Sequence, residues 1–224
     1  SMKVSTRMHL MVGLTMLGLL VICLAALFQL KETMMEDRKA KIRNLVEYAH
    51  SQLVFYDEQV KAGTLTMEQA QTLAKESLRK ARYDEKEYFW LNDYHPFSVM
   101  HPIKPELQGK DMTDNKDPTG KQLYLEFVKV VKANGAGFVD YLWSKPGQTE
   151  PVPKLSYVKG FAPWGWVLGS GIYIDDMQQE FRAQAVKALL ITLVITLAMT
   201  VLMALIVRSI SRPLDETVSA MRNI

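Results

Sequence analysis

The chain has 224 residues, 48% of them hydrophobic, and its 27 Lys and Arg residues nearly balance its 24 Asp and Glu residues, which leaves a net charge of +3. Nucleic-acid binding usually requires a concentrated basic patch, so this balance argues against a nucleic-acid partner. The apolar residues gather in two blocks that flank a polar region, a division typical of a membrane protein with a folded domain between two spans.

Two stretches, residues 9–30 and 188–207, contain no Asp, Glu, Lys or Arg. Each has about the 20 residues that a helix needs to cross the hydrocarbon core, which favours spans over buried core helices. We therefore predict transmembrane helices at residues 9–30 and 187–207. The first stretch exceeds the apolar region of a cleaved signal peptide, so we interpret it as an uncleaved anchor. The single cysteine, Cys23, lies within it, so the domain between the spans is expected to fold without a disulfide.

Basic residues flank the two predicted spans. They are Lys3 and Arg7 before the first span and Arg208, Arg212 and Arg222 after the second. By the positive-inside rule both ends of the chain are expected in the cytoplasm, with residues 1–8 as a short N-terminal segment. Residues 31–186 are then expected on the outer side of the membrane, in a periplasm.

The segment after the first span, residues 31–61, lacks proline and glycine. Its apolar residues recur at spacings of three and four and are Ile42, Leu45, Val46, Ala49, Leu53, Tyr56 and Val60. This pattern predicts one long amphipathic helix that continues the span. Its stripe packs either on its own domain alone or also on a second copy, and a length of roughly 45 Å favours the dimer. Residues 63–66 break the helix, and Thr66 with Gln69 resembles a capping box that opens a second helix to about Arg82.

Five strands and a third helix are predicted in the rest of the external domain. The strands are residues 87–91, 97–101, 138–143, 155–161 and 166–173, and the helix is residues 121–133. Gly135 ends this helix, and a Pro-Trp-Gly turn makes a hairpin of the last two strands. Residues 102–120 form a loop rich in proline, glycine and aspartate. The order of the elements predicts an α+β domain with a five-stranded antiparallel sheet.

The final strand leads directly into the second predicted span. Asp175 and Asp176 follow it and suit the start of a helix, because carboxylates accept hydrogen bonds from its first N–H groups and favour the positive end of its dipole. Residues 177–207 contain neither proline nor glycine. A displacement of the final strand is therefore expected to pass into the span as a rigid shift.

Several motifs occur in a fixed order along the external domain. They are YFWLND (88–93), MHP (100–102), GKD (109–111), DPTGK (117–121), YLWSKPG (141–147), PKLSYV (153–158) and PWGWVLGSGIY (163–173). This series resembles the single-Cache sensor domain of bacterial chemoreceptors over residues 31–180. ISRPL (210–214) resembles the start of a HAMP linker, which we place at residues 208–224.

The resemblance implies a PAS-like α+β fold with a long N-terminal helix. It also implies a homodimer, a cytoplasmic signalling module, and a two-pass location in the bacterial inner membrane with the sensor domain in the periplasm. Such domains commonly recognise small organic acids, so the resemblance implies residues that suit a carboxylate. The candidate ligand-binding residues are Lys154, His101, Tyr157, Tyr88, Trp90, Tyr141, Trp143 and Arg82.

Three of these candidates supply charge or a ring N–H. A buried carboxylate needs cationic or neutral donors to replace its lost water. Lys154 starts an apolar strand, and the alternative is a solvated strand-end lysine. His101 can donate to a carboxylate, and the alternative is a structural histidine bonded to a turn carbonyl. Arg82, at the end of the second helix, ranks as a second cation because the site would have to reach a helix end.

The aromatic candidates follow from strand alternation. Tyr88 and Trp90 share one face of their strand, as do Tyr141 and Trp143 on theirs. Such residues are either plain core or the walls of a small ligand site with polar handles. Tyr157 adds a possible donor, although its sheet face cannot be related to that of Lys154 without the start of the strand.

Enzyme functions are poorly supported. Ser156 and Ser170 lack a nucleophile elbow, there is no glycine-rich phosphate loop, and the histidines at 9, 50 and 95 form no metal-ligand spacing with His101. The small residues Gly169, Ser170 and Gly171 lie inside a strand, where they favour a close approach or a bend. We therefore predict that the protein is not an enzyme, that it has no catalytic residue, and that it binds no metal or cofactor.

The function predicted from the sequence is a transmembrane chemoreceptor for a C2–C3 monocarboxylate such as acetate, propionate or pyruvate. Two alternatives stay open: the input domain of a sensor histidine kinase or cyclase, and a structural anchor that binds no small molecule.

Overall fold

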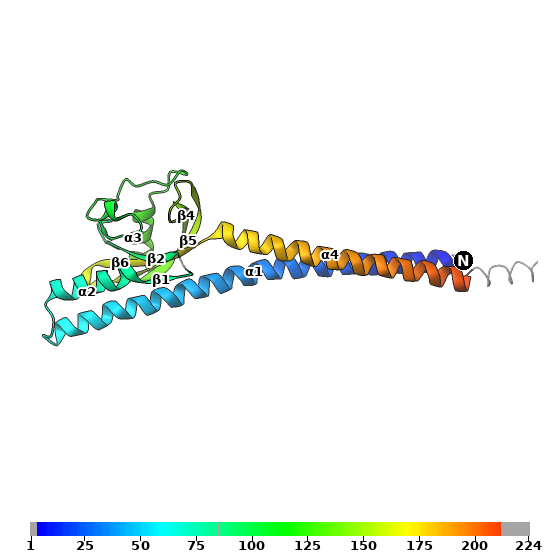
Figure 1. Cartoon of the computed structure of the whole chain (residues 1–224), viewed down its shortest axis with the longest axis horizontal. Coiled ribbons are helices and arrows are strands. Elements are labelled where there is room, and N and C mark those ends of the chain that lie inside the picture. The colour runs from blue at the N-terminus through cyan, green and yellow to red at the C-terminus, as the bar shows by residue number, and fades with distance from the viewer. Residues whose placement is uncertain (1–3, 85, 212–224) are drawn as a thin grey trace, which may run out of the picture. The chain divides into compact units, whose positions relative to one another are not determined.

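The computed structural model describes residues 4–84 and 86–211, and the chain divides into two compact units. One unit combines the chain up to Thr33 with the chain from Gln179 onward, and the other is Met34–Gln178 (Figure 1). Most of the predicted HAMP segment, residues 212–224, lies outside the described residues, as do residues 1–3.

Two long helices begin and end the described chain. Helix α1 runs over Val4–Lys61 without a break and α4 over Ile174–Ile206, followed by a π-helical turn at Val207–Ser211. Both are long and apolar enough to cross a membrane, by length and composition. The predicted continuity of the first span with the amphipathic segment is confirmed, and so is an unbroken helix after the last strand.

The second unit is built on one antiparallel sheet. Its strands are β1 (Arg82–Tyr83), β2 (Glu87–Asp93), β3 (Ser98–Met100), β4 (Ala136–Ser144), β5 (Pro151–Phe161) and β6 (Trp166–Tyr173). The strand order is β1-β2-β6-β5-β4, and β3 pairs with β2 outside this path. All five predicted strands are present, and the prediction missed β1, so the sheet formed by the described residues has six strands rather than five.

The missed strand follows α2 (Met67–Lys80), which ends two residues before the predicted Arg82. Ala81 is already extended, and the next two residues pair with the start of β2. Tyr83 holds this short strand in place, because its phenol lies 2.6 Å from the Ser170 hydroxyl and donates to the Gly171 carbonyl at 3.2 Å. The capping box of Thr66 and Gln69 at the start of α2 is confirmed.

Glycines end two of the other elements. Helix α3 (Leu123–Asn134) stops at Gly135, whose φ of 77° lies in the region that favours glycine. The turn between β5 and β6 is a 3₁₀ helix over Ala162–Trp164 that closes on the left-handed Gly165. The loop of residues 102–120 contains a further 3₁₀ turn at Pro105–Leu107.

The sheet has an apolar core on each face. Residues 34–61 of α1, together with helix α2, cover one face, where Val46, Leu53 and Leu168 are fully buried. Helix α3 covers the other face, where Phe127, Val158 and Val167 are buried (Figure 1). Successive residues of a strand point to opposite faces, so β2, β4, β5 and β6 contribute to both cores.

Side chains on the α3 face of the sheet pack unusually close to the backbone of β6. The Trp90 ring of β2 lies directly over Gly169, and a Cβ on that glycine would stand 2.2 Å from the ring carbon Cζ2. At Gly171 a Cβ would stand 2.1 Å from the Ser156 hydroxyl and 3.0 Å from Lys154 Cε. The predicted role of these small residues, a close approach, is therefore confirmed.

Replacing Gly169 tests this packing. Gly169→Ala is expected to destabilise the fold by about 1–3 kcal/mol, the usual cost of overpacking a core, in urea unfolding of the whole chain. Trp90→Leu in the same chain should restore part of the loss, because it removes the ring carbons that the new methyl group meets. Wild-type stability of Gly169→Ala alone would contradict the contact.

Candidate functional site

Lys154 is the most informative of the predicted residues. It lies in β5 between Tyr141 of β4 and Tyr173 of β6, and only 1% of its surface is exposed. Its Nζ donates to the Tyr88 hydroxyl at 3.2 Å and stands 4.3 Å and 4.8 Å from the ring centroids of Tyr88 and Tyr173. Among the described residues no carboxylate forms an ion pair with it. A buried charge without a counter-charge is costly unless something else compensates it.

The Tyr88 hydroxyl accepts hydrogen bonds from two side chains. Besides Lys154 Nζ, the Trp143 indole Nε1 donates to it at 3.0 Å. Trp90 contributes an apolar wall instead, because its Nε1 already donates to Asn92 Oδ1 at 3.2 Å while its ring covers Gly169. The prediction that Tyr88 and Trp90 share one face of their strand, and Tyr141 and Trp143 one face of theirs, is confirmed, because all four pack in the core on the α3 side.

Tyr141 and Ser156 close the floor of the cluster. The two hydroxyl oxygens lie 2.9 Å apart, and both residues are buried. Ser156 shares the sheet face of Lys154, because the two residues are two positions apart in β5. The small Gly171 beside them leaves room for the lysine side chain.

His101 is buried, with 2% of its surface exposed, and its ring centroid lies 5.1 Å from that of Tyr88 and 5.9 Å from that of Trp143. Its Nδ1 accepts the backbone N–H of Lys104 at 3.0 Å, which leaves the ring proton on Nε2. Burial, and then the charges of Lys154 and Lys104, lower the pKa of His101 to about 3. His101 is therefore a neutral ring whose Nε2–H can donate. The sequence left open a structural histidine that donates to a turn carbonyl. In the structure His101 instead accepts a hydrogen bond from a turn N–H, that of Lys104.

Two predicted residues lie elsewhere. Tyr157 is three positions from Lys154 in β5 and points to the α1 face, where its ring packs on Phe138 at 4.9 Å between centroids. Arg82 is exposed, and its Nη1 donates to the backbone carbonyls of Arg79 and Ala81. The geometry brings neither of them to Lys154.

Three residues of this region were not predicted. The ring of Tyr173 lies beside the Lys154 ammonium. The register of the β5–β6 hairpin, which pairs Tyr173 with Lys154, is the signal that would have indicated it. Lys104 is half-buried, with its Nζ 4.2 Å from the centroid of the Trp143 ring. Burial, together with repulsion from Lys154, lowers the pKa of Lys104 against the opposing attraction of Glu106. The third residue, Asp117, acts on the loop before α3.

Asp117 ties this loop to the sheet. One of its oxygens accepts the backbone N–H groups of Thr119 at 2.8 Å and Lys121 at 3.1 Å, and the other accepts that of Leu142 in β4 at 3.0 Å. Burial raises the pKa of Asp117, but these hydrogen bonds and that of the Thr119 hydroxyl outweigh it and keep the pKa below its usual value. The Asp-Pro-Thr-Gly run was the available signal, since aspartate binds the backbone two residues on in such turns.

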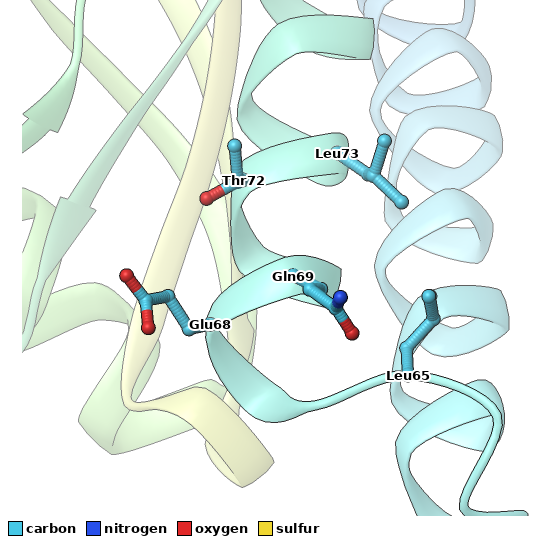
Figure 2. A pocket seen from close by; sticks show the side chains of 5 residues that line it. All are labelled: Leu65, Glu68, Gln69, Thr72 and Leu73. Carbon is cyan, nitrogen blue, oxygen red and sulfur yellow. The ribbon is translucent and has the colours of Figure 1, made fainter.

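The second unit has a cleft at this cluster and a larger hollow at the start of α2. A cleft of about 210 Å³ reaches Lys154 and Tyr141 between the Asp117 loop and the sheet. A larger one, of about 410 Å³, lies along the start of α2 and is lined by Leu65, Glu68, Gln69, Thr72 and Leu73 (Figure 2). The larger hollow presents a carboxylate and no cation, so it is a poor place for an organic anion.

Comparison with known proteins gives a consistent family. Residues 25–193 match the family described as the Cache domain. The methyl-accepting chemotaxis protein McpP of Pseudomonas putida is 42% identical over the whole chain, which spans 41% of that protein. The sensor histidine kinase MctS of Rhizobium johnstonii is 32% identical over 66% of the chain and 31% of its own length. The chain thus spans less than half the length of these relatives.

Two solved structures resemble the second unit. One, a periplasmic sensor domain of a chemotaxis protein, is 50% identical with a TM-score of 0.62, and the match covers 63% of this chain and 98% of that one. The other is a Cache chemosensory domain described for its recognition of carboxylic acids. It is 44% identical with a TM-score of 0.62, and the match covers 64% of this chain and 97% of that one.

The state of His101 can be measured directly. Because its pKa lies near 3, its ring should stay neutral with the proton on Nε2 between pH 5 and pH 8, and ¹⁵N NMR of labelled histidine should show one non-titrating ring of this tautomer. The exposed His95 provides a control resonance in the same spectrum. A His101 signal that titrates near pH 6.5, the ordinary value, would contradict the assigned burial and tautomer.

Proposed function

The chain belongs to the Cache domain family, and on that premise we propose that it is the sensory and membrane-spanning part of a chemoreceptor for a small organic acid. The proposed ligand is a C2–C3 monocarboxylate such as acetate, propionate or pyruvate, held by Lys154. The observation that carries the proposal is the buried Lys154 ammonium, for which no described carboxylate serves as partner. A ligand carboxylate would provide the missing counter-charge.

The groups around Lys154 favour a short monocarboxylate. One ammonium and one neutral Nε2–H, from His101, suit the two oxygens of a single carboxylate. The rings of Tyr88, Trp90 and Trp143 supply apolar walls for an alkyl or keto group of a few atoms. The carboxylic-acid recognition described for the 44% identical neighbour supports the same ligand class.

The two long apolar helices support the proposed location. We place transmembrane spans at residues 9–30 and 187–207 of a bacterial inner membrane, with residues 31–186 in the periplasm and a HAMP linker beginning near residue 208. The charges on the flanking segments favour this orientation. The periplasmic origin of the 50% identical neighbour agrees with it.

The proposed assembly is a homodimer through α1. Its outer part leaves Tyr48, Val54 and Phe55 exposed, at 69%, 37% and 52%, although it also buries an apolar stripe on its own sheet. Large exposed apolar side chains on a long helix favour packing against a second copy.

A histidine-kinase receptor is the second candidate, and the similarity to MctS favours it. The ligand site proposed above would be the same in both cases, and only the module that follows the HAMP linker would differ. The sequence downstream of residue 224 distinguishes the two. A third reading, the ligand-free anchor, is tested by the titration below.

A ligand panel tests the proposed substrate class. The full chain in lipid nanodiscs, titrated by calorimetry, should release or absorb heat with acetate, propionate or pyruvate and not with amino acids, amines or sugars. Succinate belongs in the panel because Lys104 lies near the cluster as a second cation. Binding of amines or sugars alone would overturn the proposal, and binding of nothing would favour the anchor.

The role of Lys154 is tested by removing its charge. Lys154→Met should weaken binding of the preferred acid by about 1.5–3 kcal/mol, or roughly 10- to 150-fold, because it removes a hydrogen bond to a charged group. The matched control is Arg82→Met, which deletes an exposed cation whose hydrogen bonds within the described residues go to backbone carbonyls, and it should leave the affinity unchanged. Wild-type affinity in Lys154→Met would exclude Lys154 as the anchor.

Signal transmission is expected to use α4 as a rigid element, because β6 ends at Tyr173 and α4 begins at Ile174. Since Met177 is buried with 2% exposure, the suitable place for a flexible insertion is after Gln178. A Gly-Gly pair inserted there, in a receptor carrying the signalling module, should leave ligand affinity nearly unchanged and abolish the ligand-dependent output. Normal signalling by this variant would direct the search for coupling to α1 or the dimer contact.

A further inference from the structure

A second polar cluster lies beside the candidate carboxylate site. It surrounds a cleft of about 290 Å³ that is lined by Asp84, Lys86, Glu87, Lys145, Pro146, Gln148, Tyr173 and Asp176. Lys145 binds both carboxylates of the first turn of α4, Asp175 and Asp176, at 2.7 Å each. The function proposed above makes no use of this cluster.

Glu87 is the unusual member. It is the first residue of β2, directly before Tyr88, and it pairs with Tyr83 of β1. Its Oε2 is buried, and among the described residues it has no hydrogen-bond partner. An ionised carboxylate oxygen in such a place lacks the donors that replace water, which favours the protonated form.

Charged and titratable groups face Glu87 from every neighbouring element. They are Tyr83 of β1, Asp84 and Lys86 of the turn, Lys145 after β4, Lys154 of β5, Tyr173 of β6 and Asp176 of α4. Asp175 of α4 acts through its ion pair with Lys145. Lys41 of α1 forms an ion pair with Asp84 and so acts at one remove. Burial raises the pKa of Glu87 to about 7, where attraction to Lys154 and Lys145 opposes repulsion from Asp176 and Asp84.

Lys154 connects this cluster to the ligand site. Its Nζ lies 4.8 Å from the centroid of the Tyr173 ring, and Lys145 Nζ lies 5.6 Å from the same centroid. Lys154 is also the strongest attraction that keeps Glu87 ionised. Glu87 and a ligand carboxylate are therefore both attracted by the Lys154 ammonium. When the negative charge of a ligand compensates this positive charge, the attraction that keeps Glu87 ionised weakens and its protonation is favoured.

We propose that the domain takes up a proton at Glu87 when it binds its carboxylate, so that acidity is a second input to the same sensor. This inference rests on the proposed carboxylate site at Lys154. By linkage, ligand binding and proton binding strengthen each other by the same factor. The proton comes from solvent and leaves Glu87 as a neutral carboxylic acid.

The direction of the pH effect follows from the two states of Glu87. Well below pH 7 Glu87 carries its proton with and without ligand, so the affinity is highest and independent of pH. Above pH 7 the free protein loses the proton while the liganded protein retains it, so binding must take one up and the affinity falls. A coupling of one pKa unit corresponds to a tenfold change in affinity. His101 is neutral throughout this range.

The proton also bears on the start of α4. Asp176 repels the ionised Glu87, and both carboxylates are attracted to Lys145. Protonation of Glu87 removes a negative charge from the surroundings of this first helical turn. Acidity and ligand thus act on the same junction between β6 and α4.

Calorimetry in two buffers of different ionisation enthalpy tests the proposal on the full chain in nanodiscs. With the tightest of acetate, propionate and pyruvate as the probe, the affinity should be about 3- to 10-fold higher at pH 6 than at pH 8.5. At pH 7.5 the dependence of the observed heat on the buffer should report net uptake of a fraction of a proton. Neither measurement requires a variant.

A variant assigns the proton to Glu87. Glu87→Gln, which has the shape and charge of the protonated acid, should bind at pH 8.5 as tightly as the wild type does at pH 6, with no proton uptake. The matched control is Glu106→Gln, which removes an exposed carboxylate beside Lys104 and should keep the pH dependence. A pH dependence of the affinity that persists in Glu87→Gln would overturn the assignment of the proton to Glu87.

The outcomes separate this inference from the proposed function. Binding of an acid with the same affinity at both pH values and no proton uptake would overturn the inference alone. Binding of no acid at any pH would overturn the carboxylate site, and the inference with it.

Discussion

The burial of the Lys154 ammonium is the constraint on which the α3 face of the sheet depends. An ammonium that has lost its water and has no ion-pair partner among the described residues needs oxygen acceptors and ring faces, and Tyr88 and Tyr173 supply them. Its side chain needs room, which Gly171 provides because no Cβ occupies that position. Burial first, and then the charges of Lys154 and Lys104, keep His101 neutral. The buried charge of Lys154 thus limits which residues can surround it and adds to the effect of burial on their protons.

Among the described residues, the polar contacts at the rim hold this arrangement without an ion pair to Lys154. Asp117 directs its carboxylate oxygens to backbone N–H groups, so it fastens the loop to β4 and does not serve Lys154 as a counter-ion. Lys104 uses its backbone N–H to orient the His101 ring and its ammonium to cover Trp143. A site built in this way retains an uncompensated positive charge, which is the property that an anion receptor needs.

The strands and their alternation were predictable, because aromatic and β-branched runs bounded by turn residues carry a strong local signal. That signal placed Tyr88, Trp90, Tyr141 and Trp143 on common faces. The side of Tyr157 was not predictable, since Pro151 and Pro153 obscured the start of β5. These prolines are tolerated because residues 151–153 pair with β4 alone, and pairing with β6 begins only at Lys154. The tautomer of His101 and the surroundings of Glu87 depend on residues distant in sequence, so no local pattern could reveal them.

The opposite orientations of Lys154 and Tyr157 have a consequence for how such a sensor can diversify. The proposed ligand-binding residue Lys154 lies on one face of β5, while Leu155, Tyr157 and Phe161 on its other face pack in the core beneath α1. The two sets alternate along the same strand and are separated by no more than the thickness of one sheet. Substitutions on the α3 face can therefore change which anion is recognised while the surface presented to α1 stays intact. A lineage of such domains can acquire new specificities one side chain at a time and keep the same packing of the sheet against α1.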